Sequence, residues 1–94
     1  MQRSILERIL AEAPGVEGKD GTYQVEEKHR VSLYVGEPGQ AMVFAEIDSI
    51  ALEDEYVRIV ARDTGANLFV LYEAIHGVGD RPPSKEQGRR AGFN

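Results

Sequence analysis

The first thirteen residues carry apolar side chains at the spacing of one helix face. Ser4 to Glu7 fits a capping box, in which the serine hydroxyl accepts a hydrogen bond from a free backbone N–H. Pro14 and Gly15 end the pattern, because proline clashes with the preceding helical turn. The sequence therefore predicts an N-terminal helix that starts at Ser4, followed by a loop from Gly15 to Gly21. The apolar positions are Ile5, Leu6, Ile9, Leu10 and Ala13.

From Thr22 the hydrophobic period changes to two, which is typical of a strand with one buried face. This alternation predicts one long strand or two short strands between Thr22 and Val35. The segment from Gly36 to Gly39 contains the glycine and proline residues that favour a turn. The apolar positions on one parity are Tyr23, Val25, Val31, Leu33 and Val35.

The second half of the chain continues the strand pattern. Residues 42–52 are strand-like, but their alternation slips near Asp48, which predicts a bulge or a corner. Residues 56–62 alternate again, residues 63–67 have turn chemistry, and residues 68–72 form the next apolar run.

These elements predict an α+β fold in which an N-terminal helix is followed by a four- to five-stranded antiparallel meander. We expect the meander to curl into a small β-barrel, because an open sheet with one helix would leave apolar surface in water. With 94 residues the chain has room for one domain. We expect a single helix-plus-small-barrel domain over residues 1–79 and a flexible basic tail over residues 80–94.

The composition removes several classes of function. Cysteine is absent, which excludes disulfides and thiolate chemistry. His29 and His76, the only histidines, lie far apart in the sequence, so we expect no metal site and no cofactor. We find no secretion signal and no apolar run long enough to cross a membrane, so the expected location is cytoplasmic.

The net charge of −5 conceals an asymmetry along the chain. Residues 1–80 carry a net charge of −8, whereas residues 81–94 carry +3. An acidic body disfavours nucleic acid and anionic membranes as partners. The acidic run from Glu46 to Glu55 is either a solvated hairpin or a docking site for a basic partner.

The string Asp63-Thr64-Gly65-Ala66 is similar to the active-site signature of aspartic proteases, whose retroviral members are dimers of short chains. That resemblance implies a dimeric enzyme that uses Asp63. Arg62 stands where that family has an apolar residue. The other interpretation is a hairpin turn, in which the aspartate bonds the backbone and the glycine takes positive φ.

Tyr56, Arg58 and Arg62 fall on one parity of the same predicted strand. Tyrosine and arginine are enriched in protein interfaces, so these three residues are our candidate partner-binding site. The alternative is a solvated strand face covered by long side chains. A nucleic-acid site would instead use Arg58, Arg62 and the tail residues Arg89 and Arg90.

The order of elements resembles the Sm and Hfq-like small barrels. The resemblance rests on a first strand over residues 29–35 before a glycine turn and a late strand over residues 69–75 before a basic tail. It implies a ring-forming protein whose edge strands pair between subunits and whose pore binds uridine-rich RNA. Glu73 and Ala74 follow Tyr72 where Hfq-like chains carry a Lys-His pair.

We therefore expect a non-enzymatic protein-interaction or adaptor module that binds another protein and forms homo-oligomers through its sheet edges. Residues 68–72 contain neither the proline nor the lysine that usually protects such an edge. The alternative is a nucleic-acid-binding small barrel, and the third is the protease.

Overall fold

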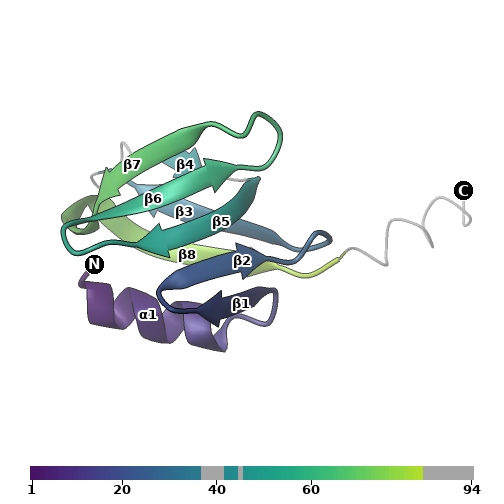
Figure 1. Cartoon of the computed structure of the whole chain (residues 1–94), viewed down its shortest axis with the longest axis horizontal. Coiled ribbons are helices and arrows are strands. Elements are labelled where there is room, and N and C mark those ends of the chain that lie inside the picture. Colours follow the sequence, from purple (N-terminus) through teal and green to yellow (C-terminus); the bar gives the residue numbers. More distant parts are fainter. Residues whose placement is uncertain (37–41, 45, 84–94) are drawn as a thin grey trace, which may run out of the picture.

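The computed structural model describes residues 1–36, 42–44 and 46–83, which form one helix and two antiparallel sheets (Figure 1). The first sheet has the strand order β1-β2-β5-β6-β7, and the second has the order β4-β3-β8. The predicted α+β class, with an N-terminal helix and antiparallel strands, is confirmed. The elements are α1 (Arg3–Glu12), β1 (Val16–Lys19), β2 (Thr22–Val25), β3 (Arg30–Val35), β4 (Met42–Phe44), β5 (Ile47–Leu52), β6 (Tyr56–Ala61), β7 (Asn67–Leu71), the 3-10 turn η1 (Tyr72–Ala74) and β8 (Ile75–Arg81).

The cap of helix α1 lies two residues earlier than the capping box predicts. Gln2 is the cap residue, and its backbone carbonyl accepts hydrogen bonds from the N–H groups of Ile5 and Leu6. Ser4 lies inside the first turn, so the predicted cap at Ser4 is wrong. The helix ends at Glu12, as the following Pro14 requires.

The segment predicted as a loop before Gly21 is strand β1, which forms a hairpin with β2. Asp20 and Gly21 both have positive φ, at 53° and 80°, which is the backbone of a tight two-residue hairpin turn. An Asp-Gly pair is the usual sequence signal for that turn. The sequence therefore contained the signal for this turn, but residues 16–19 are identified as a strand only by their pairing with β2.

Within the residues that the structure describes, the number of strands is eight rather than the predicted four or five, and they are divided between two sheets. The reason is that β2 and β3, which share one alternation pattern, pair with different partners: β2 with β5, and β3 with β4 and β8. Among the strands of the described residues, no pairing closes a barrel. The predicted bulge is confirmed, because the β5–β6 register shifts between Ile47 and Ser49.

The apolar faces of both sheets pack with α1 in one hydrophobic core. Leu6 and Leu10 of the helix are fully buried there. The last strand runs to Arg81, so Asp80 and Arg81 belong to the second sheet rather than to the predicted tail. Residues 84–94 lie outside the described residues, and so does most of the predicted turn at residues 36–39. The buried core consists of Leu6, Leu10, Val25, Val31, Leu33, Ile47, Ile50, Leu52, Val57, Ile59, Val70 and Ile75.

Candidate interaction surfaces

Tyr56 and Arg58 lie on the solvent face of the first sheet. Alternation turns the intervening Val57 into the core and leaves these two side chains exposed. The β6–β7 register places Leu71 opposite Tyr56 and Phe69 opposite Arg58 on the same face. We call these four residues the outer patch.

The outer patch is unusually apolar for a solvent face. Phe69 is 64% exposed and Leu71 is 55% exposed. The rings of Tyr56 and Phe69 meet edge to face, with centroids 5.7 Å apart. Such an arrangement is favourable for aromatic pairs, so the two rings hold each other in place while Phe69 still offers most of its surface.

Strand β7 also leaves backbone groups free at the edge of the sheet. Among the described strands, β6 is its only neighbour. The N–H of Ala61 donates to the carbonyl of Ala66 at 2.9 Å, which sets the alternation of the β6–β7 ladder. The N–H and C=O groups of Asn67, Phe69 and Leu71 therefore point toward the open edge.

Arg62 does not lie on the same face as Tyr56 and Arg58. Strand β6 ends at Ala61, and the Arg62 side chain crosses to the loop between β2 and β3. There its guanidinium donates hydrogen bonds to backbone carbonyls at 3.0, 3.0 and 3.1 Å. The shared face predicted for the three residues therefore holds for Tyr56 and Arg58 only. The acceptors are the carbonyls of Glu27, His29 and Glu26.

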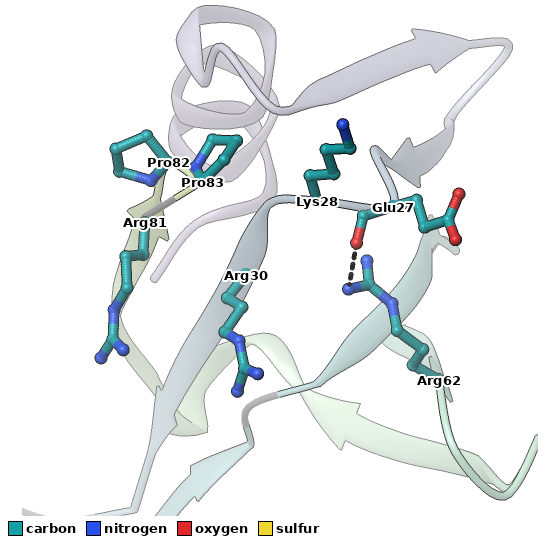
Figure 2. A pocket seen from close by; sticks show the side chains of 7 residues that line it. All are labelled: Glu27, Lys28, Arg30, Arg62, Arg81, Pro82 and Pro83. Atoms are coloured by element: carbon teal, nitrogen blue, oxygen red, sulfur yellow. Dashed lines mark hydrogen bonds between the residues drawn. The ribbon is translucent and has the colours of Figure 1, made fainter. Parts of the chain in front are cut away.

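Arg62 instead lines a basic hollow of about 490 Å³, which we call the cationic cleft (Figure 2). Arg30 of β3 and Arg81 of β8 are direct partners across the strand pair. Arg30 also forms an ion pair with Glu46. Basic side chains from three parts of the chain thus gather on an otherwise acidic protein. The lining residues are Glu27, Lys28, Arg30, Arg62, Arg81, Pro82 and Pro83.

His29 has a carboxylate partner that sequence spacing did not indicate. Its Nδ1 lies 3.0 Å from one carboxylate oxygen of Asp80, and the other oxygen accepts the N–H of Gly15 at 3.1 Å. A Cβ on Gly15 would lie 2.2 Å from the His29 ring, so only glycine leaves room for the ring. Asp80 lies 51 residues from His29, which is why no local motif signals the pair. His76 is exposed.

Tyr72 forms a second polar contact between distant parts of the chain. Its hydroxyl donates a hydrogen bond to the carbonyl of Glu53 in the β5–β6 turn. Burial raises the pKa of the Tyr72 phenol, and the nearby Arg3 guanidinium only partly offsets this effect. The folded protein therefore favours the neutral phenol, which can donate this hydrogen bond.

The protease-like string lies in the exposed turn between β6 and β7. Gly65 has a φ of 71°, and the Thr64 hydroxyl accepts the N–H of Ala66 at 3.2 Å. The positive φ of Gly65 matches the hairpin-turn interpretation of the motif, but the backbone hydrogen bond is made by Thr64 rather than by the aspartate that this interpretation named. Of the nucleic-acid candidates, Arg58 lies in the outer patch and Arg62 in the cationic cleft, while Arg89 and Arg90 lie outside the described residues.

Within residues 1–36, 42–44 and 46–83, no group of three His, Cys, Asp or Glu residues could hold a metal ion. The described part of the chain also has no helix with the length and apolar character needed to cross a membrane. A scan against models of known protein families found no match, and searches of curated proteins and of solved structures found none either.

Proposed function

We propose that this chain is a non-enzymatic protein-interaction module that self-associates through the open edge of β7. One observation carries the proposal: an edge strand that, among the described strands, pairs on one side only and displays two largely exposed apolar side chains, Phe69 and Leu71. Native edge strands are normally protected by lysine, proline or a bulge, or are covered by another element. The five residues of β7, Asn67–Leu71, contain no such protecting residue.

The partner strand is β7 of a second copy, which runs antiparallel with Phe69 facing Phe69 of that copy. This register places the outward-pointing backbone groups of Asn67, Phe69 and Leu71 in hydrogen-bonded pairs and forms about six new backbone hydrogen bonds. It also brings the two outer patches together across the dyad. Tyr56 and Arg58 then flank the apolar centre, as aromatic and arginine residues do in many interfaces.

The finer interpretations of the fold remain proposals beside this one. A ring of small barrels, as in the Sm-like model, would also pair edge strands between subunits. Such a ring requires two different edges from each copy, whereas the two-fold symmetric β7 dimer uses the same edge of both copies. The number of subunits therefore separates the two models. The nucleic-acid alternative would have to span separate places on the surface, because Arg58 and Arg62 do not share a face.

Sedimentation equilibrium of the full chain tests the proposal. We expect a dimer at micromolar concentration, and we expect Phe69→Lys to give a monomer because two like charges would face each other at the dyad. The matched control is Ile5→Lys, which makes the same kind of change at an exposed apolar position of α1 and should leave the dimer intact. Circular dichroism would verify that both variants are folded.

A wild-type protein that remains monomeric at about 100 times that concentration would contradict the proposal. An equal loss of dimer in the Phe69 and Ile5 variants would also contradict it, because the effect would then not depend on β7.

A further inference from the structure

Two arginines lie opposite each other on neighbouring strands of the second sheet. Arg30 and Arg81 are register partners in β3 and β8, so their side chains leave the sheet on the same face. Figure 2 shows the two side chains extending in the same direction from neighbouring strands. Like charges in this position are destabilising. An anion between the two guanidinium groups would relieve that repulsion.

Arg62 adds a third guanidinium from the opposite side of Arg30 (Figure 2). Its hydrogen bonds to the β2–β3 loop fix the group before any ligand arrives. A fixed guanidinium loses less conformational freedom on binding than a free surface arginine. The cleft therefore has one rigid cation and two cations on paired strands.

The charges of the cleft indicate the charge of its ligand. The lining carries four basic side chains, those of Lys28, Arg30, Arg62 and Arg81, and one carboxylate, that of Glu27, while Glu46 forms an ion pair with Arg30. The Glu27 carboxylate points away from Arg30 and Arg81 (Figure 2). The four basic groups thus exceed these two carboxylates by two charges, which a dianion would balance.

From this arrangement we infer that the cationic cleft binds the dianionic phosphate group of a small phosphate monoester. Guanidinium groups match phosphate oxygens through paired N–H donors, which a lysine ammonium cannot reproduce. A volume of about 490 Å³ lies within the range of small-molecule sites. The described lining residues include no aromatic ring on which a nucleobase could stack, and Pro82 and Pro83 supply the apolar wall instead.

A compact ligand fits better than a long polyanion. The cleft is a local basic site on a chain whose first 80 residues carry a net charge of −8. Phosphates of a polymer outside the cleft would meet this negative field, whereas a monoester places its whole charge inside the cleft.

Isothermal titration calorimetry with phenyl phosphate at pH 7.5 tests the inference, because a phosphate monoester with a second pKa near 6 is a dianion at that pH. We expect saturable one-to-one binding. Arg81→Ala should weaken it about tenfold or more, since charge-assisted hydrogen bonds to an anion are lost. Arg81→Lys should recover only part of the affinity. The matched control is Arg8→Ala on the exposed side of α1, which should bind as the wild type does.

Glu46→Gln should bind more tightly, because it frees Arg30 from its internal carboxylate. Absence of binding by the wild type, or equal weakening by the Arg81 and Arg8 changes, would overturn the inference. Tighter binding of a ten-nucleotide single strand than of phenyl phosphate, with the same dependence on Arg81, would replace the small ligand with nucleic acid. The F69K variant should retain phenyl phosphate binding, so this test is independent of self-association.

Discussion

Replacing Arg62 with alanine should destabilise the protein more than any other change to an arginine that is accessible to solvent. The change removes three hydrogen bonds that hold the loop between β2 and β3, which is one of the connections between the two sheets. Hydrogen bonds that involve a charged group contribute about 1.5 to 3 kcal/mol each. Two of these three are exposed, so water replaces the guanidinium there, while the carbonyl of His29 is partly buried. We therefore expect a loss of about 2 kcal/mol rather than the sum.

Urea unfolding followed by circular dichroism measures this loss, and thermal unfolding should show a decrease in Tm of roughly 10 °C for a chain of this length. Arg62→Lys should recover less than half, because one ammonium cannot span three carbonyls as a planar guanidinium does. Arg8→Ala is the control and should stay within about 0.5 kcal/mol of the wild type. The acceptors are neutral carbonyls, so 1 M NaCl should change the difference little. An Arg62→Ala protein as stable as the Arg8 variant would refute the reasoning.

Three further results are expected. Leu10→Ala should cost about 2 to 5 kcal/mol in urea unfolding because Leu10 is fully buried, whereas Ile5→Ala, at a position 45% exposed, should cost far less; equal losses would contradict the described core. Asp80→Ala should cost about 2 to 3 kcal/mol in the same assay, because it leaves the N–H of Gly15 without an acceptor, and Asp80→Asn should cost less. Burial raises the pKa of Tyr72, so the unfolded chain ionises this phenol first as the pH rises through about 10. The stability advantage of wild type over Tyr72→Phe should thus be full below pH 10 and shrink above it in urea titrations from pH 8 to 11; a constant advantage would contradict the burial of the phenol.

The faces of the strands were predictable from the sequence, but their partners were not. Alternation correctly assigned Val25, Val31, Leu33 and Val57 to the core, because a strand's side chains alternate whatever it pairs with. The division into two sheets depends on which edges meet, and the 26–29 connection carries no local signal for a change of sheet. The predicted barrel was therefore an extrapolation from local pattern to non-local pairing.

The same distinction explains the candidate sites. Tyr56 and Arg58 share a face because they are two residues apart on one strand, which is a local property. Arg62 binds carbonyls more than 30 residues away in the sequence. Every residue has a backbone carbonyl, so the residue types do not indicate which carbonyls accept these hydrogen bonds. The opposition of Arg30 and Arg81 likewise depends on the β3–β8 register, which joins residues 51 positions apart.

The pairing of β8 with β3 also determines when the fold can be completed during synthesis. A ribosome delivers β3 and β4 well before β8, so β3 must wait with one edge open until about 50 further residues have been made. The carboxylate that joins His29 to Gly15 arrives with the same late strand, at Asp80. The nascent chain can therefore form the β1–β2 and β6–β7 hairpins early, because their contacts are local, while the second sheet closes last. During that interval the β3 edge can pair with strands of other chains, as any open edge can.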